Sequence, residues 1–187
     1  ECPFAMKLYF IAGETSGDAR GAEVMQALEA RATAEGMPLK FYGAGGPKMQ
    51  ALAPAIQDWS GEAVVGLWDV LKKYGYFRRQ FHAMLREIAE RKPDAVVFVD
   101  YPGFNLRLAK ALRKRGTSAR LIYYISPQVW AWNRRRIPQM AQTLDRMLCL
   151  FPFEKALYEE SGLPTDFVGH PLLDTLAAKQ LGVSRDP

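Results

Sequence analysis

Short apolar runs alternate along the chain with longer stretches in which apolar residues recur every three or four positions. The short runs are typical of buried strands, and the longer stretches are typical of amphipathic helices. The run at 95–99, Ala-Val-Val-Phe-Val, is apolar at every position and predicts a strand that is buried on both faces. The pattern predicts strands at 7–12, 39–42, 95–99, 121–125, 146–150 and 165–168, and helices at 19–34, 47–53, 62–73, 77–91, 105–115, 134–143 and 153–161.

This order of elements sets the expected fold class. Strands that alternate with helices form βαβ units, so we expect an α/β fold, with a Rossmann-like parallel sheet and helices on both of its faces. A length of 187 residues suits one domain with a short extension. We assign residues 6–174 to that domain. Residues 175–187 read as a linker, and we interpret them as the start of a connection to a further domain.

Composition narrows the class of protein. Hydrophobic residues make up 49% of the chain and charged residues 24%, as in an ordinary globular protein. Cys2 and Cys149 form no disulfide framework, and Cys149 lies in an apolar run that predicts a buried free thiol. No apolar stretch approaches the ~20 residues that span a bilayer, and the first five residues do not resemble a signal peptide. We therefore expect a cytoplasmic protein.

The charge distribution adds one candidate property. The net charge is +5, and the basic residues cluster at 78–79, 113–115 and 134–136. Such clusters suit phosphate groups or an anionic membrane surface, although a solvated helix face has the same appearance. No motif of a DNA- or RNA-binding module occurs, so we expect no nucleic-acid partner. No group of His, Cys and acidic residues has metal-ligand spacing, so we expect neither a metal nor another cofactor.

The end of the strand at 95–99 carries the most informative residue. Asp100 follows the last apolar residue directly, and Pro102 and Gly103 then turn the chain into the next helix. In open α/β sheets the ligand crevice lies outside the carboxyl ends of the strands. Asp100 is therefore placed to act as a base there, while capping of a turn or helix is the alternative interpretation.

Two further loops lie at predicted strand ends. The first, at 12–18, does not fit the G-x-G-x-x-G spacing, and Glu14 and Asp18 would compete with a phosphate for backbone N–H groups. It is better suited to sugar hydroxyls than to a dinucleotide, and Ser16 or Asp18 could also cap the first helix. The second, at 43–49, holds three glycines, which would let the backbone approach a ligand closely.

Aromatic and basic residues meet in two other segments. The segment 126–136 combines Trp130 and Trp132 with three arginines, which suits stacking on sugars and binding of phosphate, or a tryptophan pair in the core. The segment 64–77 is apolar, aromatic and basic, as in helices at a membrane interface, and core packing is the alternative.

Six motifs occur in order, and together they resemble the N-terminal half of the lipid-A-disaccharide synthases. They are AGETSGD at 12–18, GGPKM at 45–49, DYPGFN at 100–105, SPQVWAW at 126–132, FPFE at 151–154 and FVGHP at 167–171. The resemblance extends from Met6 to Asp174.

The resemblance implies the N-terminal domain of a GT-B glycosyltransferase. It implies that UDP-2,3-diacylglucosamine and 2,3-diacylglucosamine 1-phosphate are joined through a β-1,6 bond, with release of UDP, in lipid A biosynthesis at the inner face of the inner membrane. Asp100 would be the general base. The expected substrate-binding residues are Glu14, Ser16, Asp18, Asn105, Ser126, Trp130, Arg134 and Arg136, and the expected membrane or acyl-chain contacts are Val64, Leu67, Trp68, Leu71 and Tyr74.

Some features depart from that family or leave alternatives open. The family more often has Ala and Asp where this chain has Tyr101 and Gly103. The chain lacks the nucleotide-binding half, so we expect it to be inactive alone. A UDP-sugar 2-epimerase with a similar fold and a non-catalytic module that docks on acidic membranes are the alternative functions. A homodimer is one possible assembly, and the sequence does not decide the oligomeric state.

Overall fold

The computed structural model describes residues 5–59 and 67–171. Its strands are β1 (Met6–Ala12), β2 (Leu39–Gly45), β3 (Ile56–Asp58), β4 (Ala95–Val99), β5 (Arg120–Tyr124), β6 (Arg146–Cys149) and β7 (Thr165–Phe167). Its helices are α1 (Thr15–Ala34), α2 (Pro47–Leu52), α3 (Leu67–Arg91), α4 (Pro102–Lys114), α5 (Val129–Trp132), α6 (Ile137–Thr143) and α7 (Pro152–Glu159), with a 3-10 turn η1 (Arg134–Arg136) before α6.

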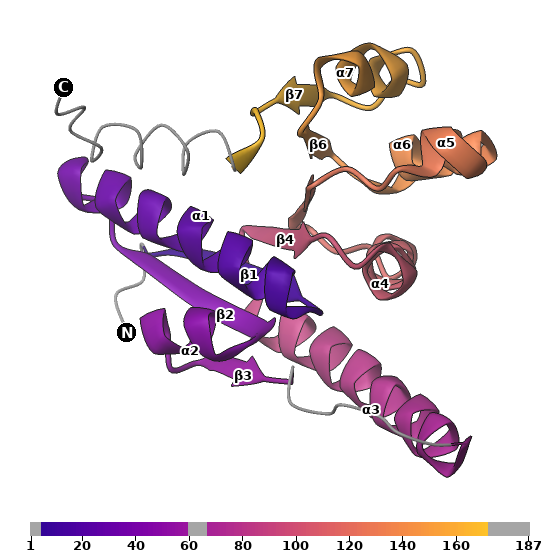
Figure 1. The fold of residues 1–187 in the computed structure, drawn as a ribbon. Helices are drawn as coiled ribbons and strands as arrows, with labels where there is room; N and C mark the ends of the chain where they lie inside the picture. The colour runs from indigo at the N-terminus through magenta and orange to yellow at the C-terminus, as the bar shows by residue number, and fades with distance from the viewer. Residues whose placement is uncertain (1–4, 60–66, 172–187) are drawn as a thin grey trace, which may run out of the picture.

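The strands form one parallel sheet in the order β3-β2-β1-β4-β5-β6-β7 (Figure 1). The chain starts at β1, proceeds outward to β3, returns to β4 beside β1, and then proceeds outward in the other direction. The strand order therefore reverses between β1 and β4, where Ala12 pairs with Val99. This arrangement confirms the predicted Rossmann-like sheet, and the reversal point is where such sheets bind ligands.

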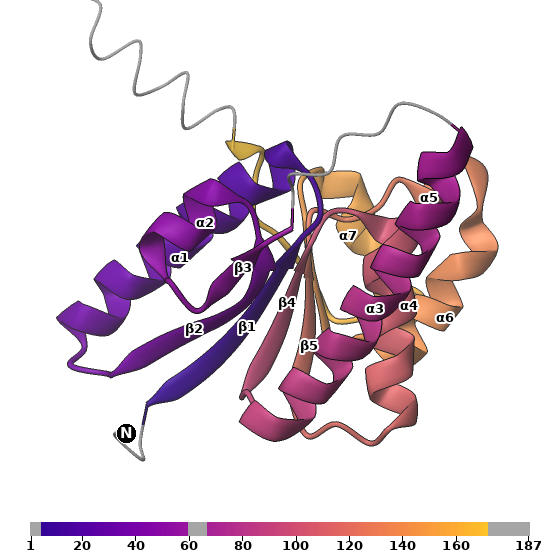
Figure 2. The same ribbon diagram turned by 90° about the horizontal axis from the view of Figure 1, so that it is seen from below.

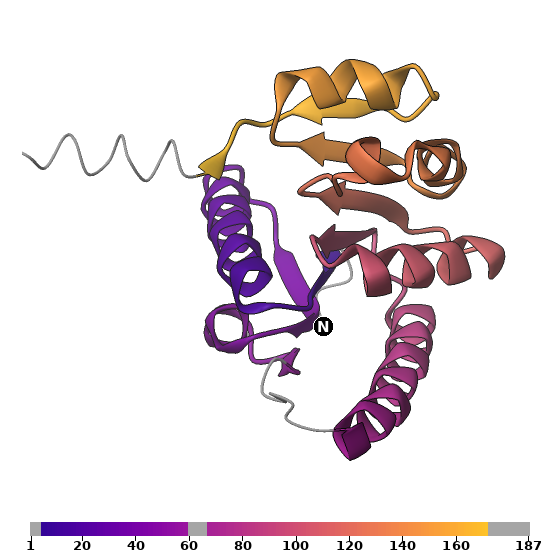
Figure 3. The same cartoon turned by 45° about the vertical axis from the view of Figure 1, so that its right-hand side comes forward.

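Helices cover both faces of the sheet, as predicted (Figure 2). On one face, α1 and α2 enclose a core that includes Phe10, Met25 and Met49. On the other face, α3, α4, α6 and α7 enclose a larger core that includes Phe98 and Tyr123. Figure 3 shows α7 beside β7, at the edge of the sheet opposite β3.

The observed elements differ from the predicted ones in places that have local causes. Instead of separate helices at 62–73 and 77–91, one helix, α3, continues from Leu67 through Gly75, because one glycine costs a helix only about 1 kcal/mol. Helix α1 begins at Thr15, before the first apolar residues that reveal its period. The sequence pattern misses β3 and α5, which are three and four residues long.

The glycines at 43–46 pack closely against neighbouring parts of the protein. Gly43 and Gly45 belong to β2, and Gly43 has a φ of +136°. A Cβ atom on Gly43 would lie 1.8 Å from the carbonyl oxygen of Phe10, and one on Gly45 would lie 2.6 Å from the sulfur of Met49. These glycines allow close packing within the protein, and their close approach to a ligand stays a prediction.

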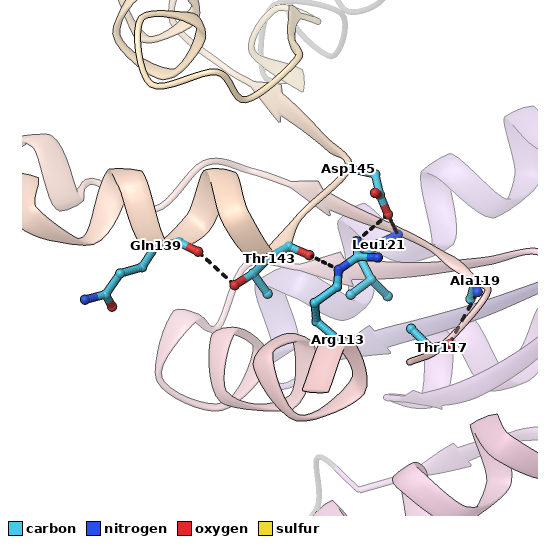
Figure 4. A network of polar contacts seen from close by, with 7 residues as sticks. All are labelled: Arg113, Thr117, Ala119, Leu121, Gln139, Thr143 and Asp145. Carbon is cyan, nitrogen blue, oxygen red and sulfur yellow. Dashed lines mark hydrogen bonds and ion pairs between the residues drawn. The ribbon is translucent and has the colours of Figure 1, made fainter. Parts of the chain in front are cut away.

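A polar network joins the far ends of α4 and α6 near the amino ends of β5 and β6 (Figure 4). Arg113 donates to the Thr143 carbonyl at 2.9 Å and to the carboxylate of Asp145 at 2.7 Å. That carboxylate also accepts the N–H of Leu121 at 2.7 Å. The network holds α6 against α4, and the space between these two helices forms part of the candidate site.

Candidate active site

Asp100 and Tyr101 occupy the reversal point of the sheet in strained backbone conformations. Their φ angles are 48° and 51°, in the left-handed region that Asp tolerates and a bulky Tyr rarely adopts. Ile125, at the end of the neighbouring strand β5, has a φ of 69°. Residues held in this way cost about 1–3 kcal/mol each and concentrate at functional sites.

Three hydrogen bonds hold the main chain of Asp100 in this conformation. Its N–H donates to the carbonyl of Tyr124 at 3.0 Å. Its carbonyl accepts the hydroxyl of Tyr123 and the side-chain amide of Asn105, both at 2.7 Å. The backbone at Asp100 is therefore held by the neighbouring strand and by buried side chains rather than left in a flexible loop.

The environment of the Asp100 carboxyl group makes it a stronger base. Partial burial raises its pKa above the ordinary value, and a hydrogen bond from the Tyr101 main chain opposes the shift without cancelling it. A carboxylate with a raised pKa is better matched to a proton-transfer role near neutral pH.

The loop after β1 lies against the loop after β4. The ring of Tyr101 packs on Gly13, where a Cβ atom would lie 2.2 Å from a ring carbon. Burial, and secondarily the charge of Glu14, raise the pKa of the Tyr101 phenol, which places Glu14 near this ring. Glu14 and Ser16 are both exposed, Glu14 directly before α1 and Ser16 in its first turn.

Asp18 has a structural position. Its carboxylate is 1% exposed and accepts the N–H groups of Gly46, Lys48 and Met49 at 2.9, 3.0 and 2.9 Å. These donors are the unpaired groups at the start of α2, so Asp18 caps α2 rather than the first helix. Both carboxylate oxygens of Asp18 accept hydrogen bonds from the protein itself. In this part of the chain, Glu14 and Ser16 are therefore the candidates for contact with a substrate.

Asn105 lies beneath the site rather than in the crevice. Its side chain is fully buried, and its amide nitrogen donates to the carbonyl of Asp100 and, at 3.4 Å, to that of Val99. Its amide oxygen has no hydrogen-bond partner within the described residues. The geometry gives Asn105 the role of supporting Asp100.

A buried glutamate, which the sequence analysis did not assign to the site, anchors the loop after β5. Glu154 is 1% exposed and accepts hydrogen bonds from Ser126 at 2.7 Å, from the Trp130 indole at 2.9 Å and from the Phe151 N–H at 3.1 Å. Its position at N3 of α7, in a capping box, was the available sequence signal. The Ser126 hydroxyl is therefore engaged by Glu154, while the Trp130 ring is half-buried beside Phe153.

Cys149, also close to Glu154, is a buried free thiol as predicted. Burial, with a smaller contribution from Glu154, raises its pKa to about 11.

A cationic groove of about 190 Å³ lies between α4 and α6 and is called the α4–α6 groove here. Arg107, Lys110 and Arg136 line it together with Gly103 at the start of α4. Arg134 lies outside it and donates to the Trp130 carbonyl at 3.1 Å. The sequence indicated Arg136 but not Arg107 and Lys110, because their meeting depends on how α4 packs beside α6.

A second groove, of about 480 Å³, lies between α3 and α4 and is called the α3–α4 groove here. The two grooves share Gly103 and Arg107. The aromatic residues that line it belong to a cluster around Trp59, whose ring centroid is 4.9 Å from that of Phe104. The complete lining is Phe77, Arg78, Phe81, Tyr101, Gly103, Phe104 and Arg107.

At the reversal point of the sheet, the carboxylate of Asp100 is carried by a strained backbone and lies near a cationic groove and an aromatic groove. This arrangement is suited to proton transfer on an anionic, partly apolar ligand. Residues 8–184 match the family model described as lipid-A-disaccharide synthetase.

The chain belongs to the lipid-A-disaccharide synthetase family.

Individual members of this family are similar over nearly the whole chain. The chain is 41% identical to lipid-A-disaccharide synthase 1 of Legionella pneumophila strain Lens, over 94% of the chain and 45% of that protein. It is 39% identical to the Trichlorobacter lovleyi synthase, over 96% of the chain and 45% of that protein. It is 42% identical to the Geobacter sulfurreducens synthase, over 90% of the chain and 42% of that protein. The chain thus spans less than half the length of these relatives.

A solved structure is also similar. The chain aligns with the crystal structure of Acinetobacter baumannii MurG with a TM-score of 0.47 and 12% identity, over 79% of the chain and 41% of that structure.

The segment expected to contact a membrane is placed only in part. Val64 lies outside the described residues, and Leu67, Trp68, Leu71 and Tyr74 belong to α3, with side chains outside the description. Among the helices that are described, none combines the length and apolar character needed to cross a membrane. Within 5–59 and 67–171, no three His, Cys, Asp or Glu side chains are grouped as metal ligands would be.

Proposed function

We propose that this chain forms the acceptor-binding part of an inverting glycosyltransferase. The reaction joins UDP-2,3-diacylglucosamine to 2,3-diacylglucosamine 1-phosphate and yields lipid A disaccharide 1-phosphate and UDP. The observation that carries the proposal is the position of Asp100. Its carboxyl group is half-buried at the reversal point of the sheet, with a raised pKa, in a chain of this family.

Asp100 acts as the general base. An ordinary Asp has a pKa of about 3.9, far too low to remove a proton from an alcohol before reaction. Asp100 instead takes the proton of the acceptor 6-hydroxyl while that oxygen bonds to the donor's anomeric carbon and the bond to UDP breaks. One displacement inverts the anomeric centre and requires no protein nucleophile. Base catalysis of this kind contributes about 10²–10⁴-fold to the rate.

The α4–α6 groove binds the acceptor's 1-phosphate. Arg107, Lys110 and Arg136 place three cationic side chains around one concavity that adjoins the Asp100 loop through Gly103. Arginine binds phosphate through paired N–H groups, and lysine adds a point charge. Glu14 and Ser16, on the neighbouring loop, are left to contact the sugar hydroxyls.

We also propose that the protein acts at the inner face of the inner membrane. Side chains along α3 support this: Arg78, Arg79 and Arg86 line one open groove together with Arg115 at the end of α4. Juxtaposed basic side chains are attracted to anionic lipid surfaces. The apolar residues expected to insert into the membrane are Val64, Leu67, Trp68, Leu71 and Tyr74. Formation of a homodimer stays a prediction, and sedimentation equilibrium, which measures the oligomeric state, would test it.

The test of the reaction uses a longer protein, which contains this chain and has the full length of the relatives. It is called the extended protein below, and it is incubated with the two acylated sugars. Mass spectrometry should show a tetra-acylated disaccharide phosphate and UDP only when both sugars are present. Conversion of the UDP-sugar without an acceptor would favour the epimerase. No conversion by folded protein that still binds anionic vesicles would favour a membrane-docking module.

A further inference from the structure

The α3–α4 groove is built as a firm aromatic surface. The Trp59 indole donates to the Ala12 carbonyl at 2.6 Å, which fixes the centre of the cluster. The rings of Phe77, Tyr101 and Phe104 lie edge-on to it, with centroids 6.0, 6.3 and 4.9 Å away. Each ring is held by others, so the groove does not need a ligand to define its shape.

These aromatic rings are not fully covered by the protein. Phe104 is buried, but Phe77, Phe81 and Tyr101 are only half-buried, and all line the same open groove of about 480 Å³. Clefts that bind small ligands are mostly apolar and span about 300–1,000 Å³. Contiguous half-exposed aromatic surface of this kind indicates a binding site for an apolar group.

The charged residues around the groove indicate which apolar group fits. Arg78 and Arg107 are exposed and line it, so a ligand with an anionic end matches better than a neutral one. Arg107 also lines the α4–α6 groove with Lys110 and Arg136. One molecule with a phosphate and a hydrocarbon chain would therefore satisfy both grooves.

The connection between the two grooves is open. Gly103 lines both, and a Cβ atom added there would meet nothing within 4 Å. The neighbouring groove residue Tyr101 follows Asp100 directly in the chain. A chain bound in the α3–α4 groove thus passes beside the residue that carries the reactive carboxylate.

We propose that the α3–α4 groove is an acyl-chain subsite. It takes one hydrocarbon chain of the acceptor whose phosphate binds in the α4–α6 groove, and Gly103 and Arg107 line both grooves where they meet. This inference rests on the proposed function for the identity of the acceptor. The subsite itself is defined by binding and requires no turnover.

The test measures binding of n-alkyl phosphates from butyl to dodecyl, kept below their micelle concentration, to the 187-residue chain by calorimetry. Complete burial of a methylene strengthens binding about fourfold. A half-open groove should still give at least about a 10-fold gain from octyl to dodecyl phosphate. Inorganic phosphate should compete with every member of the series.

Three variants separate the two grooves. Phe81→Ser should reduce the dependence of affinity on chain length and leave butyl phosphate binding unchanged. Lys110→Ala should weaken all lengths by a similar factor, about 3- to 10-fold, and keep the dependence on length. Gly103→Asp, which leaves the aromatic cluster intact, should weaken all lengths through charge repulsion. Phe153→Ser, an exposed aromatic away from both grooves, is the matched control.

Affinity independent of chain length in the wild type would overturn the proposal, and so would equal effects of Phe81→Ser and Phe153→Ser. Binding to anionic vesicles with no binding of monomeric alkyl phosphates would show a membrane-docking face instead of a subsite, and would also overturn it. If the chain-length dependence is present but the extended protein makes no disaccharide, the proposed function fails and the subsite stands.

Discussion

The hydroxyl of Tyr123 donates a 2.7 Å hydrogen bond to the main-chain carbonyl of Asp100. Tyr123 is fully buried in the strand next to the one that Asp100 follows. The bond therefore transmits the rigidity of the sheet to a residue whose backbone is left-handed. A catalytic group needs support of this kind, because displacement by about 1 Å can cost 10²-fold in rate.

Tyr123→Phe tests this support. Removal of the hydroxyl leaves Asn105 as the remaining side-chain donor to the Asp100 carbonyl, so we expect kcat of the extended protein to fall about 10-fold. KM for the acceptor should change little, because Tyr123 does not reach the crevice. Tyr9→Phe is the control, since Tyr9 is equally buried and its hydroxyl bonds to Glu87, on α3, at 2.7 Å. Equal losses of kcat in both variants would mean that only general stability is involved.

The raised pKa of Asp100 predicts a specific pH dependence. The acid limb of kcat/KM should lie at higher pH than the ordinary Asp value of about 3.9, because protonated Asp100 cannot accept a proton. The stability contribution of this group is present below its unfolded pKa and is lost as the pH rises through its folded pKa. Asp100→Asn should therefore raise the free energy of unfolding at pH 7, and Asn tolerates the left-handed backbone.

Urea unfolding at pH 7 checks the stability part, with Glu29→Gln on the exposed side of α1 as the control. A destabilised Asp100→Asn protein would show that the carboxylate stabilises the fold, contrary to its burial.

Asp18 should matter for stability rather than for substrate contact. Asp18→Ala leaves the buried N–H groups of Gly46 and Met49 without acceptors, so we expect a loss of about 1–3 kcal/mol in the free energy of unfolding. Ser16→Ala, an exposed change in the same loop, should leave stability unchanged. Denaturant unfolding compares the two. A change in acceptor KM with unaltered stability for Asp18→Ala would contradict the capping role.

Arg113 should stabilise the α4–α6 groove, the proposed phosphate site. Arg113→Lys cannot reproduce both the bond to the Thr143 carbonyl and the pair with Asp145, and we expect a loss of about 1 kcal/mol. Because the network holds the end of α6 against α4, inorganic phosphate should also bind more weakly. Lys114→Arg, at the next position, is the control. Calorimetry with phosphate measures the affinity, and thermal unfolding measures the stability. If the variant binds phosphate as tightly as wild type, the network does not support the groove.

The basic face of α3 should make membrane binding depend on salt. Arg78→Gln with Arg79→Gln removes two charges worth about 1 kcal/mol each near an anionic surface. Sedimentation with phosphatidylglycerol vesicles should show weaker binding at low salt and a smaller loss at high salt. Arg31→Gln with Lys48→Gln, on the helices that cover the opposite face of the sheet, makes the same change in net charge. Equal weakening in both pairs would show that net charge alone drives binding.

The fold could be predicted from sequence because the signals are local. The fully apolar run at 95–99 and the period of α4 depend only on neighbouring residues, and both elements are present. Helix α4 begins at Pro102, however, three residues before the expected start at 105, so Pro102 and Gly103 belong to the helix and not to the turn before it. The position of Asp100 followed from the rule that crevices lie beyond the carboxyl ends of strands. The short β3 could not be found, since it has three residues and depends on pairing with β2 and on the burial of Ile56 in the core.

The support of the site could not be predicted, because it is tertiary. Nothing in the sequence shows that Asp18 reaches the start of α2, or that Tyr123 reaches Asp100. The grooves likewise depend on the way in which α3 and α6 pack beside α4. Glu154 is an intermediate case, because its place in a capping box was visible while its bonds to Ser126 and Trp130 were not.

The central claim is that Asp100 takes the proton from the acceptor hydroxyl. The most direct test compares wild type and Asp100→Asn in the extended protein, following disaccharide phosphate by mass spectrometry in single-turnover reactions in which protein and acceptor are in excess over the UDP-sugar. We expect the rate of the variant to fall about 10²–10⁴-fold while acceptor affinity stays close to that of the wild type. A variant that forms the disaccharide at the wild-type rate would contradict the claim and move the base to another residue, with Glu14 the next candidate.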